Sequence, residues 1–261
     1  MAKISAALVK ELRDSTGIAM LKCKAALEEA SGDVEAARDI LRKQGEADAA
    51  KRSERSTGEG VVRLKLSADG KKGVALALLC ETDFVARGDD FQKIADKLIQ
   101  VAAEKGADAA KAEAEALLEE GIQKVGENLQ LGEVESLEGG QLASYIHSND
   151  KIGVLVSFKG GSEAVGKDIA MQIAAMNPRV ISPEEVPEEE IKKESQIQKE
   201  LLKQEGKPAE MIDKILEGKL RKFRDEKSLL KQAFVKDSDK TVEQFLQENS
   251  AEVEKFVRLA I

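Results

Sequence analysis

"VVRLKLSADGKKGVALALLC", at residues 61–80, decides the fold of this chain of 261 residues. Two runs rich in Val, Leu and Ala flank an Ala-Asp-Gly turn, a pattern that predicts two paired strands. Residues 142–160, LASYIHSNDKIGVLVSFKG, repeat the strand, turn and strand at an offset of 80 residues. A helical pattern follows each copy, at about 90–103 and at 162–176. This duplication predicts an α+β core with two related halves.

The first half is expected to span 61–140, and the second to span 141–183 together with 227–261. Between the two copies, an Ala- and Glu-rich helix is predicted over 108–128, ending in KVGEN. The last part of the chain predicts a short helix around 242–247 and a strand in VEKFVRLAI, which returns to the second half.

Three short helices are predicted over residues 1–45, and they form a small N-terminal bundle. Met20, Cys23 and Leu27 lie on one face of the second helix, with Leu21 widening the apolar stripe. Ser5 is expected to cap the first helix, and Gly45 is expected to end the third. Residues 46–60 are polar and predict a linker that is helical only at its start.

Residues 184–226 are highly charged and carry two stretches of helical apolar spacing. The sequence EGKP at 205–208 separates them, since proline and glycine break helices. The pattern predicts an antiparallel helical hairpin that projects from the core.

Composition excludes several classes of function. The net charge of −8 is dispersed through the chain, and such a surface repels a phosphate backbone, so no direct nucleic-acid partner is expected. Charges in the first 15 residues exclude a signal peptide, and no run of about 18 apolar residues predicts a membrane span. Cys23 and Cys80 are far apart and outside any CxxC pair, so a reducing cytoplasm is the simplest compartment.

The segment that joins strand to helix differs between the two copies. The first copy has ETDFVARGDD at 81–90, and the second has only KGGSEAVGKD at the equivalent place. The spacing of Asp89 and Gln92 predicts a capping box for the helix that follows, which leaves Asp83 and Phe84 outside it. Phe84 either folds back onto the core, with Asp83 in a local turn bond, or forms an exposed apolar wedge beside a carboxylate. Such a wedge is typical of an anchor at a protein interface.

No catalytic constellation is found. The carboxylates of Glu81, Asp83, Asp89 and Asp90 would suit magnesium, but acidic turns before helices commonly serve as caps, so neither a metal nor a cofactor is predicted. His147 is the one histidine, and no G-x-S-x-G, P-loop or G-x-G-x-x-G is present. The sequence therefore indicates a binding protein rather than an enzyme. Taken singly, His147 fits a solvated turn, and Met20 and Leu21 fit the core of the bundle.

Taken together, several segments resemble the bacterial elongation factor Ts family. They are LVKELRDSTGIAMLKCKAALEEASGDVEAA at 8–37, TDFVA at 82–86, KVGENL at 124–129, IGVLVSFKG at 152–160, IAMQIAAMNP at 169–178 and KTVEQFL at 240–246. The resemblance implies a guanine-nucleotide exchange factor that promotes release of GDP from elongation factor Tu. It also implies a ubiquitin-associated-like N-terminal bundle, a two-part core and a protruding helical hairpin.

In the family, the TDFV segment enters the partner near its magnesium site. Here that segment is Thr82, Asp83, Phe84 and Val85, with Phe84 as the wedge. The resemblance further implies an N-terminal contact by Arg13, Met20 and Leu21, and a core contact by Val125, Gly126 and His147. Family members often have a second Met where this chain has Leu21, a substitution that conserves volume. Many bacterial relatives continue with a further helical module beyond the position of Ile261, so contacts of that module are not carried over.

Two other hypotheses make different predictions. A scaffold with the same fold would bind elongation factor Tu without speeding the release of nucleotide. A metal-dependent enzyme would bind magnesium or manganese as an isolated chain.

Overall fold

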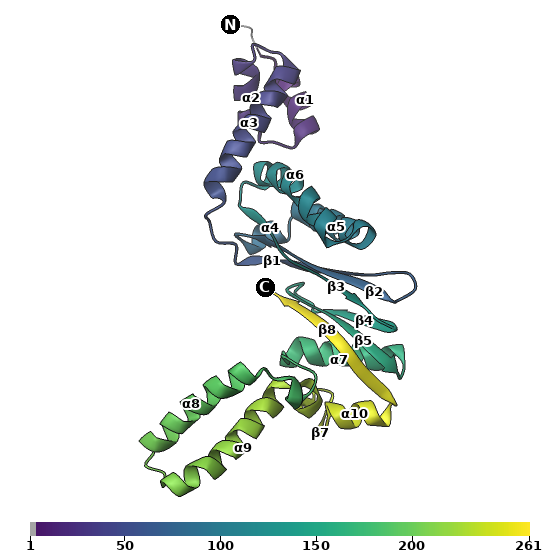
Figure 1. Cartoon of the computed structure of the whole chain (residues 1–261). Helices are drawn as coiled ribbons and strands as arrows, with labels where there is room; N and C mark the ends of the chain where they lie inside the picture. Colours follow the sequence, from purple (N-terminus) through teal and green to yellow (C-terminus); the bar gives the residue numbers. More distant parts are fainter. Residues whose placement is uncertain (1–3) are drawn as a thin grey trace.

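Two three-stranded antiparallel sheets lie at the centre of the molecule (Figure 1). The computed structural model describes residues 4–261, apart from the side chains at positions 46, 48–50 and 209. The first sheet contains, in spatial order, β1 (Glu59–Leu66), β2 (Lys72–Cys80) and β3 (Leu129–Glu138). The second contains β4 (Gln141–Ile146), β5 (Ile152–Gly160) and β8 (Ala251–Ala260). The α+β class is confirmed, and so is the strand from the C-terminal segment, whereas β3 was not predicted.

The duplication is visible in the contacts between the two sheets. The amide N of Val62 donates to the carbonyl of Asp150 at 2.6 Å, and the amide N of Leu142 donates to the carbonyl of Gly70 at 2.9 Å. The second bond is the image of the first under the 80-residue offset, with the two halves exchanged. The equivalent glycines 73 and 153 lie at the same interface, because a Cβ atom on either one would touch a side chain of the other sheet. The halves therefore pack with approximate two-fold symmetry.

Helices cover the outer faces of both sheets (Figure 1). On the first sheet, α5 (Asp89–Lys105) and α6 (Ala107–Val125) enclose a core that includes Phe91 and Leu98. On the second, α7 (Glu163–Met176) and α10 (Val242–Glu248) pack against a core that includes Phe158. The sheets, packed face to face, and their covering helices thus form layers in the order helix, sheet, sheet, helix.

The N-terminal helices are α1 (Ala6–Thr16), α2 (Met20–Glu29) and α3 (Val34–Arg52), which share a buried core. The Oγ atom of Ser5 caps α1, as predicted, by accepting from the amide N of Leu8 at 3.2 Å. The first three residues of the predicted bundle lie outside the described residues. The prediction that Gly45 ends the third helix is wrong. A Cβ atom there would lie 1.4 Å from Nε2 of Gln123, so glycine lets α3 approach α6 closely.

The charged region lies in the chain between α7 and β8, two elements of the second half of the core. A 3-10 turn, η1 (Pro183–Glu185), leads into α8 (Glu188–Gln204) and α9 (Ala209–Lys227), which project away from the sheets (Figure 1). Leu202, Ile212 and Leu216 form the buried contact between these two helices. The chain then passes through η2 (Leu229–Lys231), β6 (Ala233–Phe234) and β7 (Asp237–Thr241) before α10. Within residues 4–261, none of the helices is both long and apolar enough to cross a membrane.

Candidate functional site

Residues 83–86 form a separate short helix between β2 and α5. Thr82 caps the helix α4 (Asp83–Ala86), because its Oγ1 atom accepts from the amide N of Val85 at 3.4 Å. Ala86 is buried and Val85 is partly buried against the first core, whereas Phe84 is 85% exposed. The interpretation in which Phe84 folds back onto the core is therefore wrong. Its ring stands in solvent on a helix that is held by its neighbours.

The predicted capping box at Asp89 is also wrong. The N-cap of α5 is Gly88, which has no side chain to donate or accept, and Asp89 is the first helical residue. The side-chain Nε2 atom of Gln92 instead donates to the backbone carbonyl of Ala86, and its Oε1 atom accepts from the guanidinium of Arg63 on β1. The side chain of Gln92 is thus used to join α4, α5 and the sheet. Asp89 and Asp90 remain in the first turn, where a negative charge favours the helix dipole.

Two carboxylates join the segment before α4 to the segment after α6. Glu127 accepts from the amide N of Thr82 through Oε2 at 3.0 Å and from its hydroxyl through Oε1 at 2.7 Å. In the opposite direction, Glu81 accepts from the amide N of Asn128 at 2.7 Å. Asn128 is buried, and its Nδ2 atom donates to the carbonyl of Arg55 at 2.9 Å. We call Glu81, Thr82, Glu127 and Asn128 the reciprocal clamp.

The buried thiol of Cys80 lies next to this clamp and keeps its proton to a higher pH than a free thiol would. Burial first, and then the nearby charge of Glu127, raise the pKa of Cys80 to about 11. Its Sγ atom therefore remains a donor, and it donates to the carbonyl of Thr82 at 3.2 Å. This bond fixes a further backbone group of the segment that carries Phe84.

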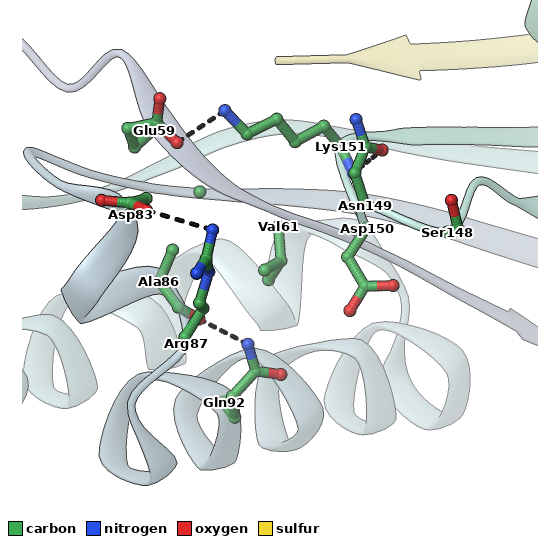
Figure 2. Close-up of a pocket in the computed structure, with 11 residues that line it drawn as sticks. Glu59, Val61, Asp83, Ala86, Arg87, Gln92, Ser148, Asn149, Asp150 and Lys151 are labelled. Carbon is green, nitrogen blue, oxygen red and sulfur yellow. Dashed lines mark hydrogen bonds and ion pairs between the residues drawn. The ribbon is translucent and has the colours of Figure 1, made fainter.

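A cleft of about 490 Å³ opens beside α4, between the two halves of the core (Figure 2). One wall carries Asp83 and Arg87, which form an ion pair at 3.1 Å, and the other is the β4–β5 turn at 148–151. Lys151 reaches across to Glu59 at 2.5 Å. The cleft is thus polar, and it places the wedge segment next to a turn from the second half of the core.

His147 immediately precedes that turn and is exposed. Its Nδ1 atom is 3.1 Å from the hydroxyl of Tyr145, which pairs the one histidine of the chain with its one tyrosine. The prediction of a solvated turn residue is confirmed. Their chain neighbours Asp83 and Ser148 line the same cleft, so His147 and Phe84, 63 residues apart in the sequence, lie in the same part of the molecule.

The N-terminal bundle contributes exposed apolar side chains. Leu21 is 82% exposed and Met20 is 50% exposed, so the interpretation of both as bundle core is wrong. The buried face of α2 is formed by Cys23, Ala26 and Leu27. Helices α1 and α3 cover only that side, because the bundle has no further element to cover Met20 and Leu21.

The turn between α1 and α2 contacts the end of α6. A Cβ atom on Gly17 would lie 3.2 Å from Cε of Lys124, the residue before Val125. Gly126, inside the predicted KVGEN segment, ends α6 in the left-handed conformation with φ 79°; it is exposed, whereas Val125 is half-buried. Arg13 is exposed in the last turn of α1.

Contacts in the structure thus link the three parts of the sequence that carry the predicted site residues. The α1–α2 turn contacts the end of α6, the residues after α6 hold Thr82, and α4 shares a cleft with the turn after His147. Sequence patterns did not reveal the roles of Glu81, Glu127 and Asn128. Their bonds join residues 45 and 47 positions apart, and the only sequence signal was the motif KVGEN itself.

Two of the acidic residues near α4 pair with cations. Glu81 pairs with Arg55 at 3.4 Å, and Asp83 pairs with Arg87. Among the side chains that the structure describes, no group of three or more His, Cys, Asp or Glu is arranged to hold a metal ion. What the arrangement presents chemically is an apolar ring and apolar N-terminal side chains beside a charged cleft.

Comparisons with known proteins agree on one family. A family model described as "Elongation factor TS" matches residues 81–261. The chain is 46% identical over 264 aligned positions to elongation factor Ts of Yersinia pestis (strain Pestoides F), covering all of this chain and 92% of the relative. The same values hold for elongation factor Ts of Yersinia pseudotuberculosis (serotype O:1b, strain IP 31758).

Proposed function

The chain belongs to the elongation factor Ts family and is a translation elongation factor, and we propose that it is the guanine-nucleotide exchange factor of elongation factor Tu. The observation that carries the proposal is Phe84, an aromatic side chain left 85% exposed by a clamped helix in a chain with only 8 aromatic residues. A partner that covered this ring would gain the free energy of removing its apolar surface from water.

Exchange of this kind needs no covalent chemistry. Magnesium bridges the nucleotide phosphates and protein oxygens, so moving one of its supports weakens the hold on GDP. Because coupling is reciprocal, a factor that binds the empty partner more tightly than the GDP-bound partner must loosen GDP by the same ratio. We therefore propose that Thr82, Asp83, Phe84 and Val85 enter the partner near its magnesium site, and that the protein is not an enzyme in the usual sense.

The size of the wedge sets what Phe84 alone can do. Burying one Phe contributes about 1.5 to 3 kcal/mol, which corresponds to about ten- to a hundredfold in an equilibrium constant. A larger acceleration requires further contacts. We assign these to Arg13, Met20 and Leu21 on the N-terminal bundle, and to Val125, Gly126 and His147 on the core.

The proposal covers the rest of the molecule as well. The N-terminal bundle would be ubiquitin-associated-like, and the α8–α9 pair would be the family's helical protrusion. The partner would be bound in both its GDP-bound and nucleotide-free states, with no direct contact to nucleic acid. We propose a cytoplasmic location, because translation elongation takes place there.

The test is a release experiment. Elongation factor Tu is loaded with a fluorescent GDP and mixed with this protein and excess unlabelled nucleotide, and the loss of signal is timed. We expect release to be faster than the spontaneous rate and to rise with the concentration of this protein. Binding to elongation factor Tu without faster release would contradict exchange and favour a scaffold.

A further inference from the structure

A helix of four residues does not hold itself in place. The first turn of any helix is unfavourable to form alone, and isolated helices shorter than about 12–15 residues are marginal in water. The α4 helix has only the residues Asp83–Ala86, and its most apolar side chain, Phe84, is exposed and so adds no packing. The direction in which Phe84 points must therefore be set by groups around α4.

Glu127 makes the most direct of these contacts. Each of its two carboxylate oxygens accepts one bond from Thr82, one from the hydroxyl and one from the backbone N–H. Because the hydroxyl of Thr82 donates its hydrogen bond to Glu127, the lone pairs of its Oγ1 atom are free to accept from the backbone N–H of Val85. Glu127 thus orients the hydroxyl that caps α4. Bonds to a charged acceptor are also stronger than bonds between neutral groups.

We propose that Glu127 is a positioning residue for nucleotide exchange, acting through Thr82 on the direction of Phe84. The inference rests on the proposed function and adds a residue to it. Without Glu127, α4 populates its ordered form for a smaller fraction of the time. The contribution of Phe84 to nucleotide release falls in proportion to the ordered fraction, because only the ordered form presents the ring in the right direction.

The test is a double-mutant cycle in the release assay, with the full chain as wild type, Glu127→Ala, Phe84→Ala and the double variant. Because Glu127 acts through Phe84, its loss cannot slow release by more than the about ten- to hundredfold that Phe84 itself contributes, and we expect release about tenfold slower for Glu127→Ala alone. In the Phe84→Ala background, the same substitution should change the rate by less than about twofold, because the ring it positions is already gone. A residue with only a general structural role would slow release equally in both backgrounds.

A matched control is Glu138→Ala at the other end of β3. Glu138 is exposed and pairs with Lys72 at 2.8 Å, so its removal deletes a comparable carboxylate far from the reciprocal clamp. We expect release at the wild-type rate. Glu127→Gln, which keeps the size of the side chain and one acceptor, should give an intermediate rate and serves if Glu127→Ala does not fold.

Hydrogen exchange separates this inference from the proposed function. In Glu127→Ala, the amide protons of residues 85–87 should exchange about tenfold faster, while those of α5 stay protected. The inference is overturned if the Glu127→Ala substitution slows GDP release equally in the wild-type and Phe84→Ala backgrounds, or if Glu127→Ala alone releases GDP at the wild-type rate. In either case the nucleotide-exchange activity of the wild-type protein stands. If the wild-type protein does not speed the release of GDP, the proposed function fails. Hydrogen exchange then still tests the inference, because an unchanged hydrogen-exchange rate at residues 85–87 of Glu127→Ala would show that Glu127 does not order α4.

Discussion

Replacing Leu21 by Ala should weaken binding to elongation factor Tu without weakening the fold. The side chain is 82% exposed, so the free protein gains almost nothing from it. Full burial of a Leu side chain is worth about 1.5–3 kcal/mol, and covering the exposed share would give about 1.2–2.5 kcal/mol. The expected loss is about 8- to 70-fold in the Kd for nucleotide-free elongation factor Tu, measured by titration calorimetry.

Leu27→Ala on the same helix is the matched control. Leu27 is fully buried, and its truncation should cost about 2–5 kcal/mol of folding stability in urea unfolding. Leu21→Ala should change that stability by less than about 0.5 kcal/mol. The reasoning is refuted if Leu21→Ala lowers stability as Leu27→Ala does, or if its Kd equals that of wild type.

Two further predictions concern the core. Gly153→Ala should destabilise the fold by about 1–3 kcal/mol in urea unfolding, since the new Cβ atom would lie 2.5 Å from Cγ1 of Val62 and force the two sheets apart. Gly140→Ala, where a Cβ atom meets nothing within 4 Å, should be neutral, and equal effects would contradict the proposed packing of the halves. The raised pKa of Cys80, from 9.0 to about 11, makes the folded state hold a proton that the unfolded state has lost between those values. The contribution of Cys80 to the free energy of unfolding should therefore be fully present below pH 9 and fall by up to about 1.4 kcal/mol per pH unit from pH 9 to 11. The free energy of unfolding of wild type should fall more steeply over this range than that of Cys80→Ala, and parallel plots against pH for the two proteins would contradict this.

Strand pairs and long helices could be predicted because each has its own local signal. The apolar runs of β2 and β5, with a turn before each, identify both hairpins and reveal the duplication. The strand β3 escaped prediction because its apolar residues do not alternate cleanly. Leu129 and Leu131 are followed by Gly132, Val134 and Leu137, and the pairing with β2 shifts register between Leu76 and Leu78.

The site was predicted in part for a different reason. Apolar spacing identifies a helix but not which apolar residues the neighbouring elements cover, so Met20 and Leu21 could not be separated from Cys23 and Leu27. The comparison between the two halves did single out residues 82–87, because only one copy carries them. The reciprocal clamp joins residues that are far apart in the sequence and meet only in the folded chain. The spacing of apolar residues along one segment cannot predict such a contact.

The most direct test of the central claim compares wild type with Phe84→Ala in the release of fluorescent GDP from elongation factor Tu, at concentrations that saturate the partner. Because Phe84 is exposed, the variant should unfold at the same urea concentration as wild type. We predict that release slows by about ten- to a hundredfold while binding through the N-terminal contact persists. Release at the wild-type rate by a folded, saturating Phe84→Ala protein would contradict the account.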